Sequence, residues 1–483
     1  MQVKTETVRG RVLSVASECV PLIKTGGLAD VVGALPGALA GQGWEMRVLM
    51  PAYRALRAQI ADWREVWRED DLWGGVGVVR AGEVAGLSLL LLDAPHLFDR
   101  EGGPYSGSQG DWGDNAQRFA ALSWVAARMA REGFDGWKPD ILHVHDWQAG
   151  LAPAYLAYGG AGGVKSVITI HNIAFQGWSA ATMLGELRLP SSEFHPGALE
   201  YYGGLSSLKA GMVTADRITT VSPTYAAELA RAEYGMGLQG VIVARAGVVS
   251  GILNGVDTGV WSPETDGDVL NYSVKSMKGK ADARAALCEE FGLDVPGPLA
   301  IVVSRLTDQK GIDLLPAVLP DFIAAGGGLA ILGSGDPALE AAMRGLHQRY
   351  PQRVGLRVGY DESLSHRMFA GADAVLVPSR FEPCGLTQMY GLRYGALPVV
   401  AAVGGLADTV IHASPAAMAA GVATGIAFHP TDAIAFATAL RHLVTLFGDQ
   451  RAWGQVQKNA MKHPVGWETS AAAYAALYEG LRA

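Results

Sequence analysis

The stretch that decides the fold is KTGGLADVVGALPGAL, residues 24–39, which follows the apolar run RVLSVASEC at residues 11–19. An apolar run, two glycines and a helical segment in succession predict a strand that turns tightly into a helix. In open α/β sheets, ligands bind at the carboxyl ends of the strands, where such turns lie. The same stretch is therefore both a fold signal and a candidate binding site.

This pattern continues along the chain, because short apolar runs alternate with longer amphipathic segments. Most of the runs are apolar throughout, as expected of parallel strands that are covered on both faces. One amphipathic segment, residues 115–131, places Phe119, Leu122, Val125 and Met129 on one side of a helix. The alternation predicts an α/β fold with doubly wound sheets. The predicted strands are residues 11–17, 46–51, 87–94, 141–147, 166–172, 217–222, 248–254, 299–306, 329–335, 354–360, 374–380 and 397–403.

The length of the chain, 483 residues, predicts more than one domain. We divide the strands between two sheets at the turn-rich segment NGVDTGVWSPETDGD, residues 254–268. The polar segment that follows, residues 268–280, is predicted to be a surface loop. The string GGLAD occurs at residues 26–30 and again at 404–408; an internal duplication and chance in a chain with 62 glycines are equally open.

Composition and charge exclude several classes of protein. Hydrophobic residues make up 49% and charged residues 18% of the chain, so it can bury sizeable cores. The net charge of −8 and the lack of a lysine- or arginine-rich block argue against nucleic acid or an acidic membrane surface as the main partner. The three cysteines are far apart, which predicts neither a disulfide framework nor a zinc site. The longest apolar runs are too short for a membrane span, and the N-terminal stretch lacks the long apolar region of a signal peptide. We therefore expect a cytoplasmic protein.

The KTGG turn suits an anionic ligand. Gly26 and Gly27 let the backbone approach a ligand closely, Lys24 adds a positive charge, and the following helix presents unpaired N–H groups. Together they could hold a phosphate or diphosphate, although the spacing is neither that of a dinucleotide fingerprint nor that of a Walker loop. A plain strand-to-helix turn with a surface lysine explains the local sequence equally well.

Two turns in the second half have a similar character. The stretch SRLTDQKG places Arg305 and Lys310 after a predicted strand, where two cations suit a diphosphate. The stretch PSRFEPCGLTQMYGL places Glu382, which could reach sugar hydroxyls, before a helical segment whose first amides could meet an anion. Ordinary surface charges and a glutamate favoured by the helix dipole are the alternatives. For Cys384 we favour a small buried hydrophobic residue over a nucleophile.

Histidines stand at two predicted strand ends. HVHDW contains His143, His145 and Asp146, and TIHNIAFQG contains His171 and Asn172. An H-x-H pair suggests zinc, but no third ligand with metal spacing is nearby, so a metal is disfavoured. Strand alternation puts His143 and His145 on the same face, where one of them could simply be packed and hydrogen-bonded. His171 is the better candidate for a ligand-facing role.

Eight motifs follow one another along the chain: KTGGLADV, HVHDWQAGLAPAY, TIHNIAFQG, NGVD, SRLTDQKG, GYDE, PSRFEPCGLTQ and GGLADTV. In this order they resemble the motifs of the bacterial glycogen synthases and plant starch synthases, and the resemblance covers essentially the whole chain. The resemblance implies a GT-B fold, in which two Rossmann-like, doubly wound α/β domains face each other across a deep cleft. It implies an acceptor-side domain at 1–253, a nucleotide-sugar domain at 254–462 and a C-terminal helix at 463–483 that packs back on the first domain.

The resemblance also implies an activity. The expected enzyme is a hexosyltransferase, ADP-glucose:α-1,4-glucan 4-α-glucosyltransferase, which transfers glucose from ADP-glucose to the non-reducing end of glycogen or another α-1,4-glucan. Transfer would retain the anomeric configuration, release ADP and require no metal or other cofactor. ADP-glucose and the glucan are the implied partners, and neither nucleic acid nor a membrane is expected.

The family's functional residues carry over to matching positions of this sequence. Arg305 and Lys310 would grip the diphosphate, Asp146 and His171 would lie near the reacting sugar, and Glu382 would be essential. The catalytic residues implied are Glu382, His171, Asp146, Arg305 and Lys310. The residues implied to bind ADP-glucose are Lys24, Gly27, Asp30, Tyr105, Asn254, Tyr360, Gly385, Leu386 and Thr387.

Three other functions stay open. A transferase that uses UDP-glucose would need the same cations, since Lys24, Arg305 and Lys310 would grip any diphosphate. A sugar-binding protein without activity could also have two domains, but the full set of charged residues argues against it. Phosphorolysis is the third, and no lysine for pyridoxal phosphate is identified. Tyr390 stands where many related transferases have a second glutamate, which weakens a sucrose-synthase-like or mannosyltransferase activity.

Overall fold

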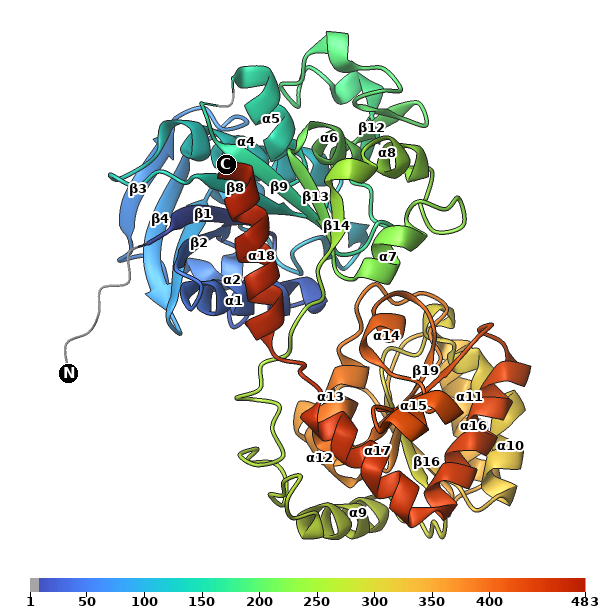
Figure 1. Ribbon diagram of the computed structural model, residues 1–483. Coiled ribbons are helices and arrows are strands. Elements are labelled where there is room, and N and C mark those ends of the chain that lie inside the picture. The colour runs from blue at the N-terminus through green and yellow to red at the C-terminus, as the bar shows by residue number, and fades with distance from the viewer. Residues whose placement is uncertain (1–7, 161, 483) are drawn as a thin grey trace, which may run out of the picture. The chain divides into compact units, whose positions relative to one another are not determined.

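The computed structural model describes residues 8–160 and 162–482 (Figure 1). The chain forms two compact units: unit 1 comprises Met1–Val221, Ala226–Asn254 and Trp467–Ala483, and unit 2 comprises Ser222–Tyr225 and Gly255–Gly466. Residues 1–7 and 483, where the predicted first domain begins and the predicted last segment ends, lie outside the described residues. No helix in the described part of the chain is long and apolar enough to cross a membrane.

Unit 1 is built on a nine-stranded sheet. Its strands are β1 (Gly10–Val15), β2 (Trp44–Pro51), β3 (Arg64–Glu69), β4 (Gly77–Val84), β5 (Leu87–Asp93), β8 (Ile141–His145), β9 (Lys165–Ile170), β13 (Arg217–Thr220) and β14 (Val249–Gly251). Their order is β14-β13-β9-β8-β1-β2-β5-β4-β3. The strands from β14 to β5 run parallel, and β4 and β3 continue the sheet antiparallel. The chain therefore reverses its direction of winding between β1 and β8, at a switch point of the kind where α/β sheets bind ligands.

Apolar runs predicted the parallel strands of unit 1, but they did not predict β3 and β4. The side chains of β3, with the sequence REVWRE, are exposed or half-buried along its whole length. An antiparallel edge with a solvated face lacks the continuous apolar run that marks a covered parallel strand. The same applies to the short strands β6 (Ser106–Gly107), β7 (Gly110–Asp111), β10 (Trp178–Ala180), β11 (Glu200–Tyr201) and β12 (Gly204–Ser206).

Helices cover the sheet of unit 1 and include the last helix of the chain. α18 (Trp467–Arg482) buries Tyr474 and Tyr478 in one core cluster with Val12, Leu35 and Trp44. The ring centroids of Trp44 and Tyr478 lie 5.1 Å apart, edge to face. Figure 1 shows α18, in red, beside α1. The other helices of the first part of the chain are α1 (Gly27–Ala40), α2 (Arg54–Arg57), α3 (Pro95–Phe98), α4 (Asn115–Glu132), α5 (Leu151–Gly159), α6 (Ser207–Thr214), α7 (Pro223–Glu228) and α8 (Gln239–Ala244).

Unit 2 contains a six-stranded parallel sheet with the order β17-β16-β15-β18-β19-β20. Its strands are β15 (Leu299–Val303), β16 (Gly328–Gly333), β17 (Val354–Val358), β18 (Ala374–Val377), β19 (Leu397–Ala401) and β20 (Ile426–Phe428). In chain order this is the doubly wound arrangement, with its switch point between β15 and β18. The parallel strands of unit 1 follow the same order, so the prediction of doubly wound sheets is confirmed.

Helices lie on both faces of the unit 2 sheet, with α10 and α11 on one side and α9 and α12 on the other (Figure 1). They are α9 (Lys278–Phe291), α10 (Leu315–Ala324), α11 (Pro337–Arg349), α12 (Glu362–Gly371), α13 (Thr387–Tyr394), α14 (Gly404–Thr409), α15 (Pro415–Ala420), α16 (Ala433–Gly448) and α17 (Gln450–Lys462). The predicted surface loop 268–280 is wrong at its end, because α9 begins at Lys278. Lys280 is buried, and its Nζ donates to the carbonyl oxygens of Ala370 (2.9 Å) and Ala372 (2.8 Å), at the end of α12.

Candidate active site

The KTGG turn connects β1 to α1 and brings two of the predicted binding residues together. The helix begins at Gly27, and Gly26 before it is extended. Nζ of Lys24 lies 2.8 Å from Oδ1 of Asp30 in the first helical turn, and the Lys24 side chain is 47% exposed. Lys24 is thus an exposed ammonium at the carboxyl end of β1, held by a carboxylate of the same turn.

Packing within the chain does not explain the two glycines of this turn. Neither Gly26 nor Gly27 has a positive φ, and a Cβ on either residue would meet no atom of the described chain within 4 Å. Larger residues would therefore fit the protein itself. The open space beside both glycines is available to a ligand.

The structure adds a residue that no sequence pattern indicated: the carboxylate of Glu18 organises the KTGG turn. Glu18 is 3% exposed and accepts hydrogen bonds from Oγ1 of Thr25 (2.6 Å) and from the amides of Thr25 and Gly26. The hydroxyl of Tyr105 also donates to this carboxylate and lies 2.7 Å from Oγ of Ser17. One buried carboxylate thus joins Tyr105, a predicted binding residue, to the turn that carries Lys24.

Two amides of the turn therefore bind a carboxylate of the chain itself. The part of the turn that can meet an external anion is the start of α1, from Gly27 onward. Glu18, six residues before Lys24, has no local sequence signature, because its role depends on the loop that folds back on it.

Asp146 and His171 follow the neighbouring strands β8 and β9 and meet at their carboxyl ends. Oδ1 of Asp146 accepts from the amides of His171 (2.7 Å) and Asn172 (3.4 Å). Burial raises the pKa of Asp146 to about 7, although the amide hydrogen bonds oppose the shift. Asp146 also has a left-handed backbone, with φ of 53°. Its carboxylate therefore fixes the chain direction after β9 and with it the position of His171.

Three of the histidines of unit 1, His143, His145 and His171, contact each other and nearby hydroxyl groups. The rings of His143 and His145 lie 4.4 Å apart, which confirms that they share a face of the sheet. Nδ1 of His145 lies 3.0 Å from Nε2 of His171. Burial lowers the pKa of His171 to about 3, so its imidazole is neutral at physiological pH.

In unit 2, the structure pairs Lys310 with Glu382. Lys310 follows β15, Glu382 follows β18, and these strands flank the switch point of the sheet. Nζ of Lys310 lies 2.5 Å from Oε2 of Glu382, which also accepts from Oγ of Ser379 at 2.9 Å. Glu382 is 8% exposed. The contact joins residues from two separate motifs, and no sequence pattern indicated the pair or Ser379.

Arg305 lies in the same turn as Lys310 but differs from it in exposure and in its side-chain contacts. Its side chain is exposed, and within the described residues it makes neither an ion pair nor a side-chain hydrogen bond. A guanidinium in this state, at the carboxyl end of a parallel strand, can bind a phosphate in a bidentate manner.

The amides of Gly385, Leu386 and Thr387 precede and begin α13. Gly385 has φ of 71°, and none of the three amides donates to a partner within the described chain. The side chain of Gln388 fastens this turn from inside, since its Nε2 donates to the carbonyl oxygens of Cys384 (3.1 Å) and Gly385 (2.9 Å). The turn is therefore a set of N–H groups at a helix N-terminus, beside the Lys310–Glu382 pair.

The second GGLAD string supports this turn. It follows β19, whereas the first follows β1, so the two copies occupy non-equivalent places in the two sheets. A Cβ on Gly404 would lie 2.0 Å from the carbonyl oxygen of Glu382, and a Cβ on Gly405 would lie 2.1 Å from that of Cys384. The amide of Gly405 donates to the carbonyl oxygens of Glu382 and Pro383, each at 3.1 Å. Here close backbone packing requires the glycines, and the shared string does not mark equivalent elements.

Two further predicted residues, one in each unit, differ in their exposure. Tyr360, at the end of β17, is 82% exposed, and its hydroxyl donates to Glu362. Asn254, at the end of unit 1, is 8% exposed, and its buried Oδ1 has no hydrogen-bond partner in the described chain.

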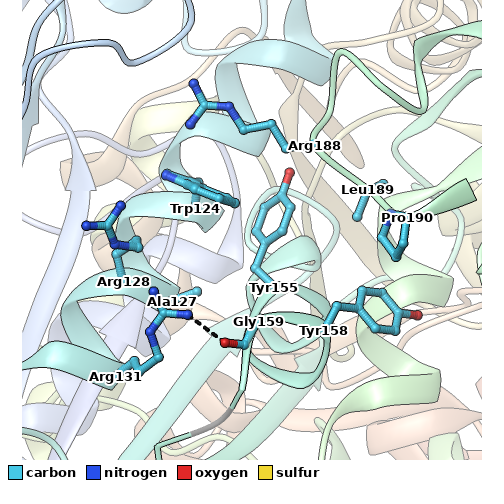
Figure 2. Close-up of a pocket in the computed structure, with 10 residues that line it drawn as sticks. All are labelled: Trp124, Ala127, Arg128, Arg131, Tyr155, Tyr158, Gly159, Arg188, Leu189 and Pro190. Atoms are coloured by element: carbon cyan, nitrogen blue, oxygen red, sulfur yellow. Dashed lines mark hydrogen bonds between the residues drawn. The ribbon is translucent and has the colours of Figure 1, made fainter.

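A separate cavity of about 410 Å³ lies in unit 1, among α4, α5 and the segment before Pro190 (Figure 2). Aromatic rings and arginines form its walls, and Nη1 of Arg131 donates to the carbonyl oxygen of Gly159 at 2.9 Å. None of the predicted site residues lines it. The lining residues are Trp124, Ala127, Arg128, Arg131, Tyr155, Tyr158, Gly159, Arg188, Leu189 and Pro190.

Among the described residues, one group with three potential metal ligands is Asp266, Asp268 and His366. Nδ1 of His366 lies 2.6 Å from Oδ2 of Asp266, and the hydroxyl of Tyr394 donates to the same carboxylate oxygen. The ring of Trp261 stacks on His366 at 3.9 Å. These contacts describe a buried hydrogen-bonded network that anchors the segment before α9.

Comparisons with known proteins agree with this architecture. The starch synthase catalytic domain model matches residues 11–244, and the glycosyl transferases group 1 model matches residues 297–445. The chain is 74% identical to a glycogen synthase of Cereibacter sphaeroides over 477 residues, which cover 99% of each chain. It is 57% identical to a glycogen synthase of Paracoccus denitrificans, covering 98% of this chain and 100% of that one.

Solved structures show the same arrangement. The catalytic domain of starch synthase IV from Arabidopsis thaliana, bound to ADP and acarbose, has a TM-score of 0.85 at 30% identity, covering 98% of this chain and 99% of that one. Sucrose-phosphate synthase from Thermosynechococcus elongatus has a TM-score of 0.60 at 21% identity over 98% of this chain and 99% of that one, a likeness of fold alone. The fold is the GT-B fold, with one Rossmann-like sheet in each unit.

Proposed function

This chain belongs to the family of glycogen synthases and starch synthases, and from that premise we propose that it transfers glucose from ADP-glucose to the non-reducing end of an α-1,4-glucan. The reaction releases ADP and retains the anomeric configuration. Glycogen or a related glucan is the acceptor.

The observation that carries this proposal is the group of charges at the switch point of unit 2. Arg305 offers a guanidinium without a carboxylate partner in the described chain, and Lys310 lies 2.5 Å from Glu382. The amides of Gly385, Leu386 and Thr387 add N–H donors at the start of α13. Two cations and a helix N-terminus suit a diphosphate, and a nearby carboxylate suits sugar hydroxyls. A nucleoside diphosphate sugar has both parts.

The identity of the donor rests on a relative. The Arabidopsis starch synthase IV, 30% identical to this chain, is described as bound to ADP and acarbose. ADP is the product that transfer from ADP-glucose would leave behind. The cations of this chain would hold UDP equally well, so the choice of base needs a direct test.

The chemistry follows from the charges. As the bond between glucose C1 and the diphosphate oxygen breaks, positive charge grows on the sugar and negative charge on the leaving ADP. Arg305, Lys310 and the helix amides stabilise the leaving group, because fixed dipoles and charges act strongly where water is excluded. The 4-hydroxyl of the glucan bonds to C1 on the face that ADP leaves, and its proton passes to the departing phosphate oxygen. Trapping of a covalent glucosyl–enzyme would disprove this front-face mechanism.

Unit 1 carries candidate ligand groups of its own. Lys24 offers its ammonium at the end of β1, where the open sides of Gly26 and Gly27 leave room for a ligand. The Asp146–His171 pair offers a neutral imidazole at the end of β9. No metal is needed in this scheme, because lysine and arginine provide the positive charge.

The decisive assay measures ADP or UDP release with glycogen present, for ADP-glucose and UDP-glucose, with and without EDTA. We expect rapid turnover of ADP-glucose that resists EDTA and elongates the glucan. Glu382→Ala should lose at least about 100-fold in kcat, because it leaves Lys310 without its carboxylate and removes a sugar contact. Lys24→Ala should mainly raise KM for the donor.

Other outcomes change the proposal in defined ways. A preference for UDP-glucose would keep the mechanism and change the donor. Loss of turnover in EDTA that Mg²⁺ restores would disprove the metal-free scheme. No turnover with either donor, together with tight binding of ADP, would favour a binding protein.

A further inference from the structure

Two hydrogen-bonded chains run through three histidines of unit 1, His143, His145 and His171, and one of these chains is complete within the protein. In this closed chain, the Tyr478 hydroxyl lies 2.7 Å from Nδ1 of His143, and Nε2 of His143 lies 2.6 Å from Oγ1 of Thr169. Oγ1 of Thr169 lies 2.6 Å from Oγ1 of Thr219, which donates to the carbonyl oxygen of Ile168 at 3.5 Å. Every donor in the closed chain has an acceptor, and the chain ends on a backbone carbonyl.

The second chain runs parallel to the first and ends at the candidate site. Oγ of Ser14, on β1, lies 3.2 Å from Nε2 of His145, and Nδ1 of His145 lies 3.0 Å from Nε2 of His171. Ser14 and His145 are fully buried, whereas His171 is partly exposed. Nδ1 of His171 makes no hydrogen bond within the described chain. We call this the open chain, because its last ring nitrogen is left for a ligand.

The protons in the open chain can be placed by counting donors and acceptors. A neutral imidazole has one N–H donor and one acceptor nitrogen. Burial lowers the pKa of His143 and His171 to about 3 and that of His145 well below its usual value, so all three rings are neutral at physiological pH.

The Ser14 hydroxyl decides the direction. It is buried, and in the described chain its one side-chain hydrogen bond is to His145. If Ser14 donates, Nε2 of His145 accepts, Nδ1–H of His145 donates to Nε2 of His171, and the proton of His171 resides on Nδ1. If Nε2–H of His145 donated to Ser14 instead, the buried Ser14 hydroxyl proton would have no acceptor. An unsatisfied buried donor costs the full desolvation free energy of that group.

We propose that Ser14 and His145 are positioning residues that hold His171 as the Nδ1–H tautomer, with a single N–H aimed at an oxygen of the bound sugar. The proposal rests on the proposed function, since it names the state in which His171 meets the sugar nucleotide. An Nδ1–H group binds an oxygen lone pair and cannot accept a proton from a hydroxyl. Asp146 complements this arrangement, because it fixes the backbone of His171 through the amide.

The direct test is the nitrogen NMR spectrum of protein labelled with ¹⁵N-histidine, recorded without ligand near pH 7. Two-bond and three-bond couplings to the ring protons distinguish the Nδ1–H from the Nε2–H tautomer, and the resonances missing in His171→Gln assign His171. We expect Nδ1–H. An Nε2–H tautomer for His171 in the wild-type protein would overturn the proposal.

A matched pair of variants tests the role of the open chain. Ser14→Ala removes the buried hydroxyl that starts the open chain, and Thr219→Val removes one from the closed chain at similar volume. Ser14→Ala should give a measurable fraction of Nε2–H tautomer at His171 and lower kcat/KM by about tenfold, the size of one lost hydrogen bond. Thr219→Val should change neither. Equal effects of the two variants on tautomer and kcat/KM would contradict the proposal.

Substitutions of His145 provide a rescue experiment. Asn places its side-chain N–H close to the position of Nδ1, so His145→Asn should keep kcat/KM within about threefold of the wild type. His145→Leu should lose as much as His171→Ala, and the double variant should lose no more than either, because both remove the same contact. Equal losses in His145→Asn and His145→Leu would indicate packing alone and refute a positioning role.

These readouts separate the two proposals. The tautomer is measured in the ligand-free protein, so this result does not depend on whether either sugar nucleotide is turned over. If ADP-glucose is turned over but His171 carries its proton on Nε2, the positioning proposal fails and the proposed function does not.

Discussion

At the scale of single residues, the glycines of the KTGG turn allow an effect on ligand binding to be distinguished from an effect on stability. A Cβ on Gly27 meets nothing in the described chain, and Gly27 is the first residue of α1. Gly27→Ala should therefore leave the free energy of unfolding unchanged or raise it by up to about 1 kcal/mol, since Ala favours a helix. KM for ADP-glucose should rise about tenfold, because the methyl group enters the space assigned to the ligand.

Gly37→Ala is the matched control for this prediction. Gly37 lies in the same helix, and a Cβ there also meets nothing within 4 Å. Its substitution should have the same effect on urea unfolding and none on KM. A Gly27→Ala enzyme with unchanged KM would show that the donor does not approach this turn.

The buried carboxylate of Asp146 predicts a pH dependence of stability. Burial raises its pKa in the folded protein to about 7, above the ordinary value of 3.8. Between these two values the folded protein holds a proton that the unfolded chain releases, so stability decreases as pH rises from about 4 to about 7. Relative to Asp146→Asn, the free energy of unfolding of the wild type should fall over this range and level off above it. Urea unfolding at several pH values measures the difference; a constant difference would refute the raised pKa.

At the scale of elements, the second GGLAD string joins α14 to the turn that carries Glu382. A Cβ on Gly405 would lie 2.1 Å from the carbonyl oxygen of Cys384, so Gly405→Ala must displace that turn. We expect a loss of about 1–3 kcal/mol in stability, as for other overpacked sites, and a fall in kcat as Glu382 moves away from Lys310.

Gly345→Ala is the control for this element, since Gly345 lies in α11 and a Cβ there meets no atom within 4 Å. It should retain full activity. Full activity in Gly405→Ala would mean that the Glu382 turn does not depend on its contact with α14. The same string thus contains glycines for two different reasons: close backbone packing at Gly405, and open space assigned to a ligand at Gly27.

Sequence patterns predicted elements better than they predicted contacts. The continuous apolar runs marked the parallel strands of both units except the three-residue strand β20, and the spacing of Phe119, Leu122, Val125 and Met129 marked α4 to within one residue. Strands β3 and β4 were missed because one solvated face breaks the apolar run. The pair of Lys310 and Glu382 was also missed as a pair, since the order of strands in the sheet, which brings β15 next to β18, is a property of the tertiary structure.

At the scale of the whole molecule, unit 1 depends on a helix from the other end of the chain. Tyr478 of α18 is fully buried, packs edge to face on Trp44 and reaches His143. Tyr478→Ala should cost about 3–5 kcal/mol. Hydrogen exchange followed by mass spectrometry should show weaker protection in β1, β2 and β8 and unchanged protection in β15 to β18.

The reciprocal variant Trp453→Ala removes a buried ring from α17, in unit 2. It should weaken the protection from hydrogen exchange in unit 2 and leave the protection in unit 1 unchanged. If either variant weakens both units equally, the two units unfold as one, and the division of the chain into separate cores is wrong.

Patterns along the chain were enough to identify most of the buried parallel strands, helix α4, the order of the binding motifs and the family, because burial period, turn residues and motif spacing are local properties. The tertiary structure alone decided which groups meet. Glu18 closes on Thr25 and Tyr105, Lys310 lies against Glu382, and His145 orients His171, each across a distance in sequence that no pattern spans. Such contacts depend on strand order and loop return, so their chemistry exists only after the sheets have formed.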